Sequence, residues 1–167
     1  ALNPELNNAI AKKLLPLAKI VTPNLFEASQ LSGLKEITTL EQMEEAAQII
    51  YDKGAKYVFI KGGSKLASSK ETQKAIDVFY DGQSFGYIEN DLIDTKWTHG
   101  AGCTTAAAIT AGLASGLTPV VLATQFINES LSASFALNKW VGPGNPTAWR
   151  KNKAIYTIED QSVLDEE

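Results

Sequence analysis

The chain has 167 residues, of which 44% are hydrophobic and 20% are charged, the proportions of one globular domain with a sizeable buried core. Its formal net charge of −4 disfavours nucleic acid or an anionic membrane as a partner, and its single cysteine excludes an internal disulfide. The single histidine leaves too few ligands for a zinc cluster. We therefore expect a cytoplasmic protein.

The start of the chain predicts a helix, a strand and a second helix. Asn3 followed by Pro4 is typical of a helix start, and we expect this helix to run to about residue 16. The β-branched segment 18–22 predicts a short buried strand. Asn24 is then in position to cap a helix that extends to Leu31.

The central part predicts a helix, a strand and a hairpin. The helix begins at one of two alternative capping boxes and ends near Gly54; the boxes are Thr38 with Glu41 and Thr39 with Gln42. The elements that follow are a strand over 56–60, a polar loop over 64–72, and a hairpin with strands over 76–80 and 85–88.

The last part predicts two helices, one after Gly100 and one begun by Thr118 and Pro119, before an acidic tail over 159–167. This order of elements predicts a layered α/β fold with a mainly parallel sheet. In such sheets ligands bind beyond the carboxyl ends of the strands. Three sets of polar groups should meet there, and they are Asn24 with Glu27, Lys61, and the turn 100–103.

The glycine-rich turn before the first of these two helices is the most informative motif. Residues 98–103 read THGAGC, and a helix that starts here leaves backbone N–H groups without intrahelical partners. These groups and the helix dipole form a site for a phosphate or a developing oxyanion. Cys103 lies within that positive field, which favours its thiolate. We interpret it as a candidate general base, the alternative being a small packed hydrophobe.

The other candidates also have structural alternatives. Glu27 stands three residues after Asn24, so the pair is either a simple capping box or a phosphate and Mg²⁺ site. Lys61 follows an apolar strand and precedes Gly62 and Gly63, which let a phosphate approach the backbone while the ammonium neutralises its charge. A solvated strand-end lysine is the alternative, and Lys65 is a further candidate for nucleotide contact.

Three motifs together resemble one known family. Residues 21–28 (VTPNLFEA), 59–63 (FIKGG) and 98–104 (THGAGCT) resemble the vitamin kinases of the ribokinase superfamily, above all hydroxymethylpyrimidine/phosphomethylpyrimidine kinase and its bacterial relatives that phosphorylate pyridoxal. Residues 138–143 resemble the pyridoxal-type branch. The resemblance extends from about Leu2 to Lys151, and Trp97 departs from the asparagine usual in the family.

The resemblance implies a three-layer α/β/α ribokinase-like fold over residues 1–158, with the N-terminal part of the family fold missing. It places Cys103 at the catalytic-base position and the backbone N–H groups of 100–102 (Gly100, Ala101 and Gly102) around the transferring phosphoryl group. It further implies that nucleotide is bound by Asn24, Glu27, Lys61, Gly62, Gly63, Lys65 and Thr98, with Glu27 serving Mg²⁺.

The implied function is ATP-dependent phosphorylation of a hydroxymethyl group on a heteroaromatic ring, by a homodimer. We expect a pyrimidine acceptor of thiamine biosynthesis first and pyridoxal or pyridoxine as the alternative. A second alternative is a catalytically incomplete nucleotide-binding fragment. A dinucleotide-binding domain is disfavoured, because no Gly-x-Gly-x-x-Gly motif follows a predicted strand.

Overall fold

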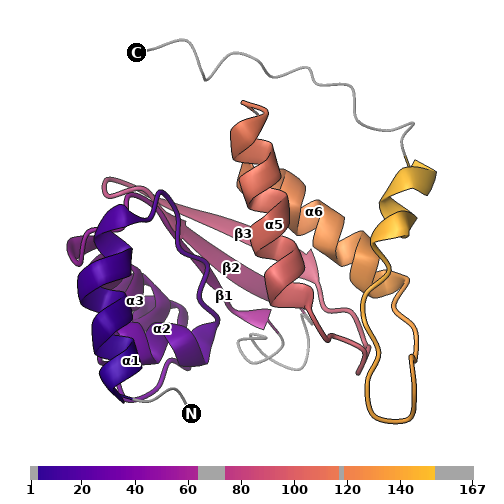
Figure 1. Ribbon diagram of the computed structural model, residues 1–167, viewed down its shortest axis with the longest axis horizontal. Helices are drawn as coiled ribbons and strands as arrows, with labels where there is room; N and C mark the ends of the chain where they lie inside the picture. The colour runs from indigo at the N-terminus through magenta and orange to yellow at the C-terminus, as the bar shows by residue number, and fades with distance from the viewer. Residues whose placement is uncertain (1–3, 64–73, 117–118, 153–167) are drawn as a thin grey trace.

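The computed structural model, drawn in Figure 1, describes residues 4–63, 74–116 and 119–152. Its elements in chain order are α1 (Pro4–Ala9), η1 (Ile10–Leu14), η2 (Leu15–Leu17), α2 (Leu25–Ser32), α3 (Leu40–Asp52), β1 (Val58–Lys61), β2 (Lys74–Tyr80), β3 (Phe85–Asp91), α5 (Ala101–Ala114), α6 (Pro119–Ser132) and η4 (Pro146–Asn152). The predictions for Asn3, Lys65, Thr118, the loop 64–72 and the tail 159–167 lie outside the described residues.

The sheet lies between two groups of helices, as the layered prediction requires (Figure 1). Side chains of β1 alternate between two cores: Val58 and Ile60 pack with residues of α2 and α3. Phe59 points the other way, into a core with Ile109 of α5 and Ala123 of α6. These three of the four β1 side chains are fully buried, so β1 contributes to both cores.

The prediction of a mainly parallel sheet is wrong for the described residues. Their one sheet has three strands in the order β1-β2-β3, and both pairs are antiparallel. The turn between β2 and β3 explains one pair: Asp81 accepts hydrogen bonds from the amides of Gln83 and Ser84, and such a short connection joins antiparallel strands. The hairpin itself is confirmed, and its strands are longer than predicted.

A parallel neighbour of β1 is supplied by the segment predicted as the strand 18–22. It forms a bridge from Val21 to Val58, and Asn24 just after it forms a bridge to Lys61, although neither belongs to a regular strand. The amides of Phe59 and Lys61 donate to the carbonyls of Val21 and Pro23 at 2.8 and 2.9 Å. This pairing carries the start of α2 to the same edge as the end of β1.

Helix boundaries follow the predicted caps where the described residues include them. Asn24 and Glu27 form a reciprocal capping box, and α2 ends at Gly33, whose φ is +89°. Of the two alternatives for α3, Thr39 with Gln42 is the capping box. The single helix predicted to residue 16 is instead α1, a π-helical turn and a 3-10 turn that contains Pro16.

No helix within the described ranges has both the length and the apolar character needed to cross a membrane.

Candidate active site

A cavity of about 510 Å³ lies between the end of β1, the start of α2 and the start of α5. The predicted site residues that line it are Asn24, Lys61, Gly62, Gly63, Thr98, Ala101 and Gly102. These come from three motifs far apart in sequence, so the predicted convergence at one edge of the sheet is confirmed. Gly100, Glu27 and Cys103 stand beside the cavity lining rather than in it.

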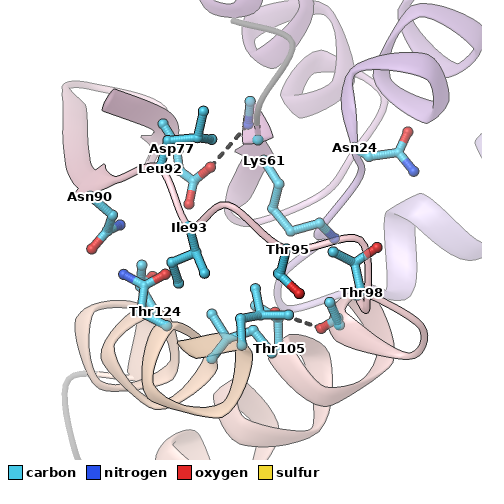
Figure 2. Close-up of a pocket in the computed structure, with 18 of the residues that line it drawn as sticks. Asn24, Lys61, Asp77, Asn90, Leu92, Ile93, Thr95, Thr98, Thr105 and Thr124 are labelled. Carbon is cyan, nitrogen blue, oxygen red and sulfur yellow. Dashed lines mark hydrogen bonds between the residues drawn. The ribbon is translucent and has the colours of Figure 1, made fainter. Parts of the chain in front are cut away.

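Lys61 connects the parts of the site. Its ammonium donates to the carbonyl of Thr22, and a Cβ placed on Gly102 would lie 3.9 Å from its Nζ. Figure 2 shows the side chain extending from the end of β1 toward the start of α5. Burial lowers the pKa of Lys61, and the neighbouring acidic groups of Glu27, Asp77 and Cys103 oppose that shift.

The start of α5 has the geometry of an anion site. Gly100 precedes the helix in the left-handed region with φ +79°, a conformation that glycine adopts without strain. The Ala101 amide donates to the carbonyl of Thr98 at 3.1 Å, and its contact with a phosphoryl group stays a prediction. Gly102 and Cys103 are the second and third helical residues, whose N–H groups have no partner within the helix.

A second loop holds this turn in place. The amide of His99 donates to the carbonyl of Gly142 at 3.2 Å, and His99 forms a bridge with Pro143. Gly142 is buried, and a Cβ on it would lie 2.6 Å from the Trp97 ring. Trp97 therefore occupies space that only a glycine at 142 leaves open. The departure noted at Trp97 is accommodated by this close packing.

The Cys103 side chain is exposed. It is close enough to Lys61 to act on the charge of the ammonium. The alternative of a small hydrophobe packed at the helix start is therefore wrong, because a packed thiol would be buried.

Asn24 and Glu27 form the helix capping box that the sequence analysis gave as the alternative to a phosphate and Mg²⁺ site. The Asn24 side chain accepts from the Glu27 amide, and the Glu27 carboxylate accepts from the Asn24 amide, both at 2.9 Å. The capping box does not exclude a ligand, since a carboxylate has further lone pairs and the Asn24 side chain lines the cavity.

Besides Asp91, the sequence analysis missed the charged cavity residue Asp77. It lies on β2 opposite Lys61, and its Oδ1 accepts from the Gly62 amide at 3.0 Å. Burial raises the pKa of Asp77 to about 6, against the opposing effects of the Gly62 amide and the Lys61 ammonium. The available signal was a lone acidic residue inside the apolar strand 76–80. Because Gly62 is buried and already donates to Asp77, its amide is not open to a phosphate.

The chain was compared with known proteins. The profile of the phosphomethylpyrimidine kinase family matches residues 1–145. Pyridoxine kinase of Bacillus subtilis is 48% identical over 155 residues, which are 91% of this chain and 56% of that protein. Hydroxymethylpyrimidine/phosphomethylpyrimidine kinase of Haemophilus influenzae is 35% identical over 147 residues, which are 86% of this chain and 54% of that protein.

A solved structure gives the same relationship in three dimensions. Pyridoxal kinase from Staphylococcus aureus, in complex with AMP-PCP and pyridoxal, is similar with a TM-score of 0.84 and 44% identity, over 90% of this chain and 55% of that one. The chain thus spans about half the length of the relatives that it matches. The profile match and these identities show that the chain belongs to the phosphomethylpyrimidine kinase family, within the ribokinase-like superfamily.

Proposed function

We propose that this chain is the nucleotide-binding and phosphoryl-transfer part of an ATP-dependent vitamin kinase, whose acceptor is the hydroxymethyl group of pyridoxal or pyridoxine. One observation carries the proposal: the Lys61 ammonium lies beside Gly102, at the helix start where the amides of Gly102 and Cys103 have no partner within the helix. A fixed cation and convergent N–H groups at one wall of a cavity are suited to the charge that develops in phosphoryl transfer.

The proposal puts pyridoxal or pyridoxine before the pyrimidine, which is the reverse of the expectation from the sequence motifs. Identity is 48% to a pyridoxine kinase and 35% to a hydroxymethylpyrimidine/phosphomethylpyrimidine kinase. The pyrimidine remains the second candidate because the family profile carries that activity in its name. Both acceptors present a hydroxymethyl group on a heteroaromatic ring, so the same transfer chemistry serves either.

In the proposed mechanism the start of α5 binds the γ-phosphoryl group of ATP through the amides of Gly102 and Cys103. Lys61 neutralises the phosphate charge from the β1 side. The Cys103 thiolate takes the proton of the acceptor hydroxyl as that oxygen attacks the γ-phosphorus. The bond from the γ-phosphorus to its bridging oxygen breaks, and ADP leaves with the electron pair.

Glu27 is the residue proposed to serve Mg²⁺. Among the described residues no three His, Cys, Asp or Glu side chains form a group that could hold a metal. Mg²⁺ does not need one, because in kinases it is bound by one or two carboxylates, substrate phosphates and water. The half-buried Glu27 carboxylate next to Lys61 fits that requirement, and the ion would neutralise phosphate charge.

A comparison of acceptors tests the proposal. Phosphate transfer from ATP is measured with pyridoxal, pyridoxine and hydroxymethylpyrimidine, on this chain and on the longer protein that contains it, if there is one. The proposal expects the highest kcat/KM for the pyridine acceptors. Higher kcat/KM for the pyrimidine would contradict the acceptor assignment. ADP binding without transfer to any acceptor would instead favour the incomplete nucleotide-binding fragment. The homodimer stays a prediction, checked by sedimentation of the same samples.

A further inference from the structure

Asp77 is placed where it can fix the position of the end of β1. The register of the β1–β2 pair sets Asp77 opposite Lys61, and both residues line the cavity. The Asp77 carboxylate accepts from the amide of Gly62, the next residue of the chain after Lys61, at 3.0 Å. Figure 2 shows this bond as a dashed line beside the base of the Lys61 side chain. One carboxylate is thus tied to the backbone that carries the phosphate-site lysine.

Asp77 does not stand where a phosphate would meet the lysine. The Lys61 ammonium is at the other end of the side chain, bonded to the Thr22 carbonyl and close to Gly102. Asp77 therefore acts on the position of the strand end more than on the charge that the ligand meets.

Among the described residues, few charged groups surround Asp77. On β1 the Lys61 ammonium acts on its charge, and on β3 its partner is the apolar Ile88. The cavity residues from α5 and α6 are neutral, among them Thr105, Thr124 and Asn128. Asp91 of β3 also lines the cavity and is paired with Lys74. Protonation of Asp77 would thus remove the charge that strengthens its bond to the Gly62 amide.

We propose that Asp77 is a positioning residue for nucleotide binding: its carboxylate fixes the Gly62 amide, and with it the end of β1 that carries Lys61, and uptake of a proton by this carboxylate weakens the hold. The inference rests on the proposed nucleotide site. Burial brings the titration into an accessible range, since it raises the pKa of Asp77 to about 6.

The test is calorimetric titration of ADP into the chain between pH 5 and pH 8. The variants are Asp77→Asn, which removes the charge at constant shape, and Asp94→Asn, which removes an exposed charge outside the cavity lining. Asp94→Asn should bind ADP with the same affinity as the wild type at every pH. Any pH dependence that comes from the titration of ADP itself should therefore appear in both proteins. Asp77→Asn should bind ADP about tenfold more weakly at pH 8, because the acceptor of the Gly62 amide loses its charge, and approach the wild type at pH 5.

Each outcome separates the two proposals. Equal ADP affinity for Asp77→Asn and the wild type across the pH range would overturn the positioning role alone. Failure of the wild type to bind ADP at any pH would overturn the nucleotide site and the inference with it.

A second test of the inference uses the wild type alone, so it does not depend on whether a variant folds. The Gly62 amide shift in a proton–nitrogen NMR spectrum should follow a titration with a midpoint near pH 6, as the pKa of about 6 for Asp77 requires. A Gly62 shift that is flat between pH 5 and pH 8 would also overturn the inference.

Discussion

Cys103 and Lys61 are the residues on which the proposed chemistry depends, and both could be found from their local sequence. Each follows or precedes glycines at the end of a predicted element, where the backbone leaves room for a phosphate. Asp77 could not be found in this way, because its importance comes from the register that sets it opposite Lys61. A single acidic residue within a strand looks the same in sequence when it faces solvent.

Cys103→Ala should abolish turnover while nucleotide binding is kept. General-base catalysis contributes about 10²- to 10⁴-fold, and because the thiol is exposed its replacement should leave the fold intact. We expect kcat to fall at least about 100-fold in an active protein that contains this chain, with a Kd for ADP within about twofold of the wild type. Undiminished kcat would remove Cys103 from the base role.

Lys61→Met should weaken the binding of ligands in proportion to their phosphate charge. Methionine keeps most of the buried stem of the lysine and loses the ammonium that lies near Gly102. ADP affinity should fall about tenfold or more, whereas adenosine affinity should change little. The two ligands are compared by titration on the same variant, and an equal loss for both would indicate a disturbed fold rather than a lost phosphate contact.

At the scale of elements, the caps and turns were predictable from the sequence, and the relative direction of the strands in the sheet was not. The capping boxes and the Asp81 turn rest on contacts within four residues, so the local sequence specifies them. The pairing of β1 with β2 is set across the residues 64–73, which carry no local signal for direction. The segment 18–22 was predicted as a buried strand, but its residues are half-buried or exposed, and its pairing with β1 is a contact between residues 37 positions apart, Val21 and Val58.

Gly142→Ala should loosen the loop that holds the turn before α5. The added Cβ would lie 2.6 Å from the Trp97 ring, and the loop also carries the carbonyl bonded to His99. We expect a loss of about 1–3 kcal/mol in the free energy of unfolding, the usual cost of overpacking, together with weaker ADP binding. Gly86→Ala is the matched control, because its Cβ would meet nothing closer than 3.8 Å. Urea unfolding of both variants checks this; equal stability would contradict it.

Asp77→Asn should raise stability at neutral pH even as it weakens ADP binding. Burial raises the pKa of Asp77 from 3.8 to about 6, so between these values the folded chain binds more protons than the unfolded chain. Stability therefore falls as pH rises through this window, and the cost is fully present above about pH 6. Removing the charge should stabilise the fold by about 1–3 kcal/mol at pH 8, with little difference at pH 4.

Thermal unfolding of Asp77→Asn and the wild type at both pH values measures this difference. A variant less stable than the wild type at pH 8 would show that the bond to Gly62 outweighs the cost of burying the charge.

At the scale of the whole molecule, β1 organises both cores and the site. Its alternating side chains join the α2–α3 group to the α5–α6 group, and its last residue reaches the cavity between them. This explains why three distant motifs converge, although the mainly parallel sheet from which their meeting was predicted is not found in the described residues. The acceptor could not be predicted in the same way, since the chain spans about half the length of the relatives that it matches.

The most direct test of the central claim is a proton–nitrogen NMR titration of this chain with ADP, with adenosine as the reference ligand. The claim is that unpartnered amides at the start of α5, beside Lys61, bind a phosphate. ADP should shift the amides of Gly102 and Cys103 strongly, and adenosine should leave them nearly unchanged. Saturating ADP that moves neither amide, or adenosine that moves both equally, would contradict the account.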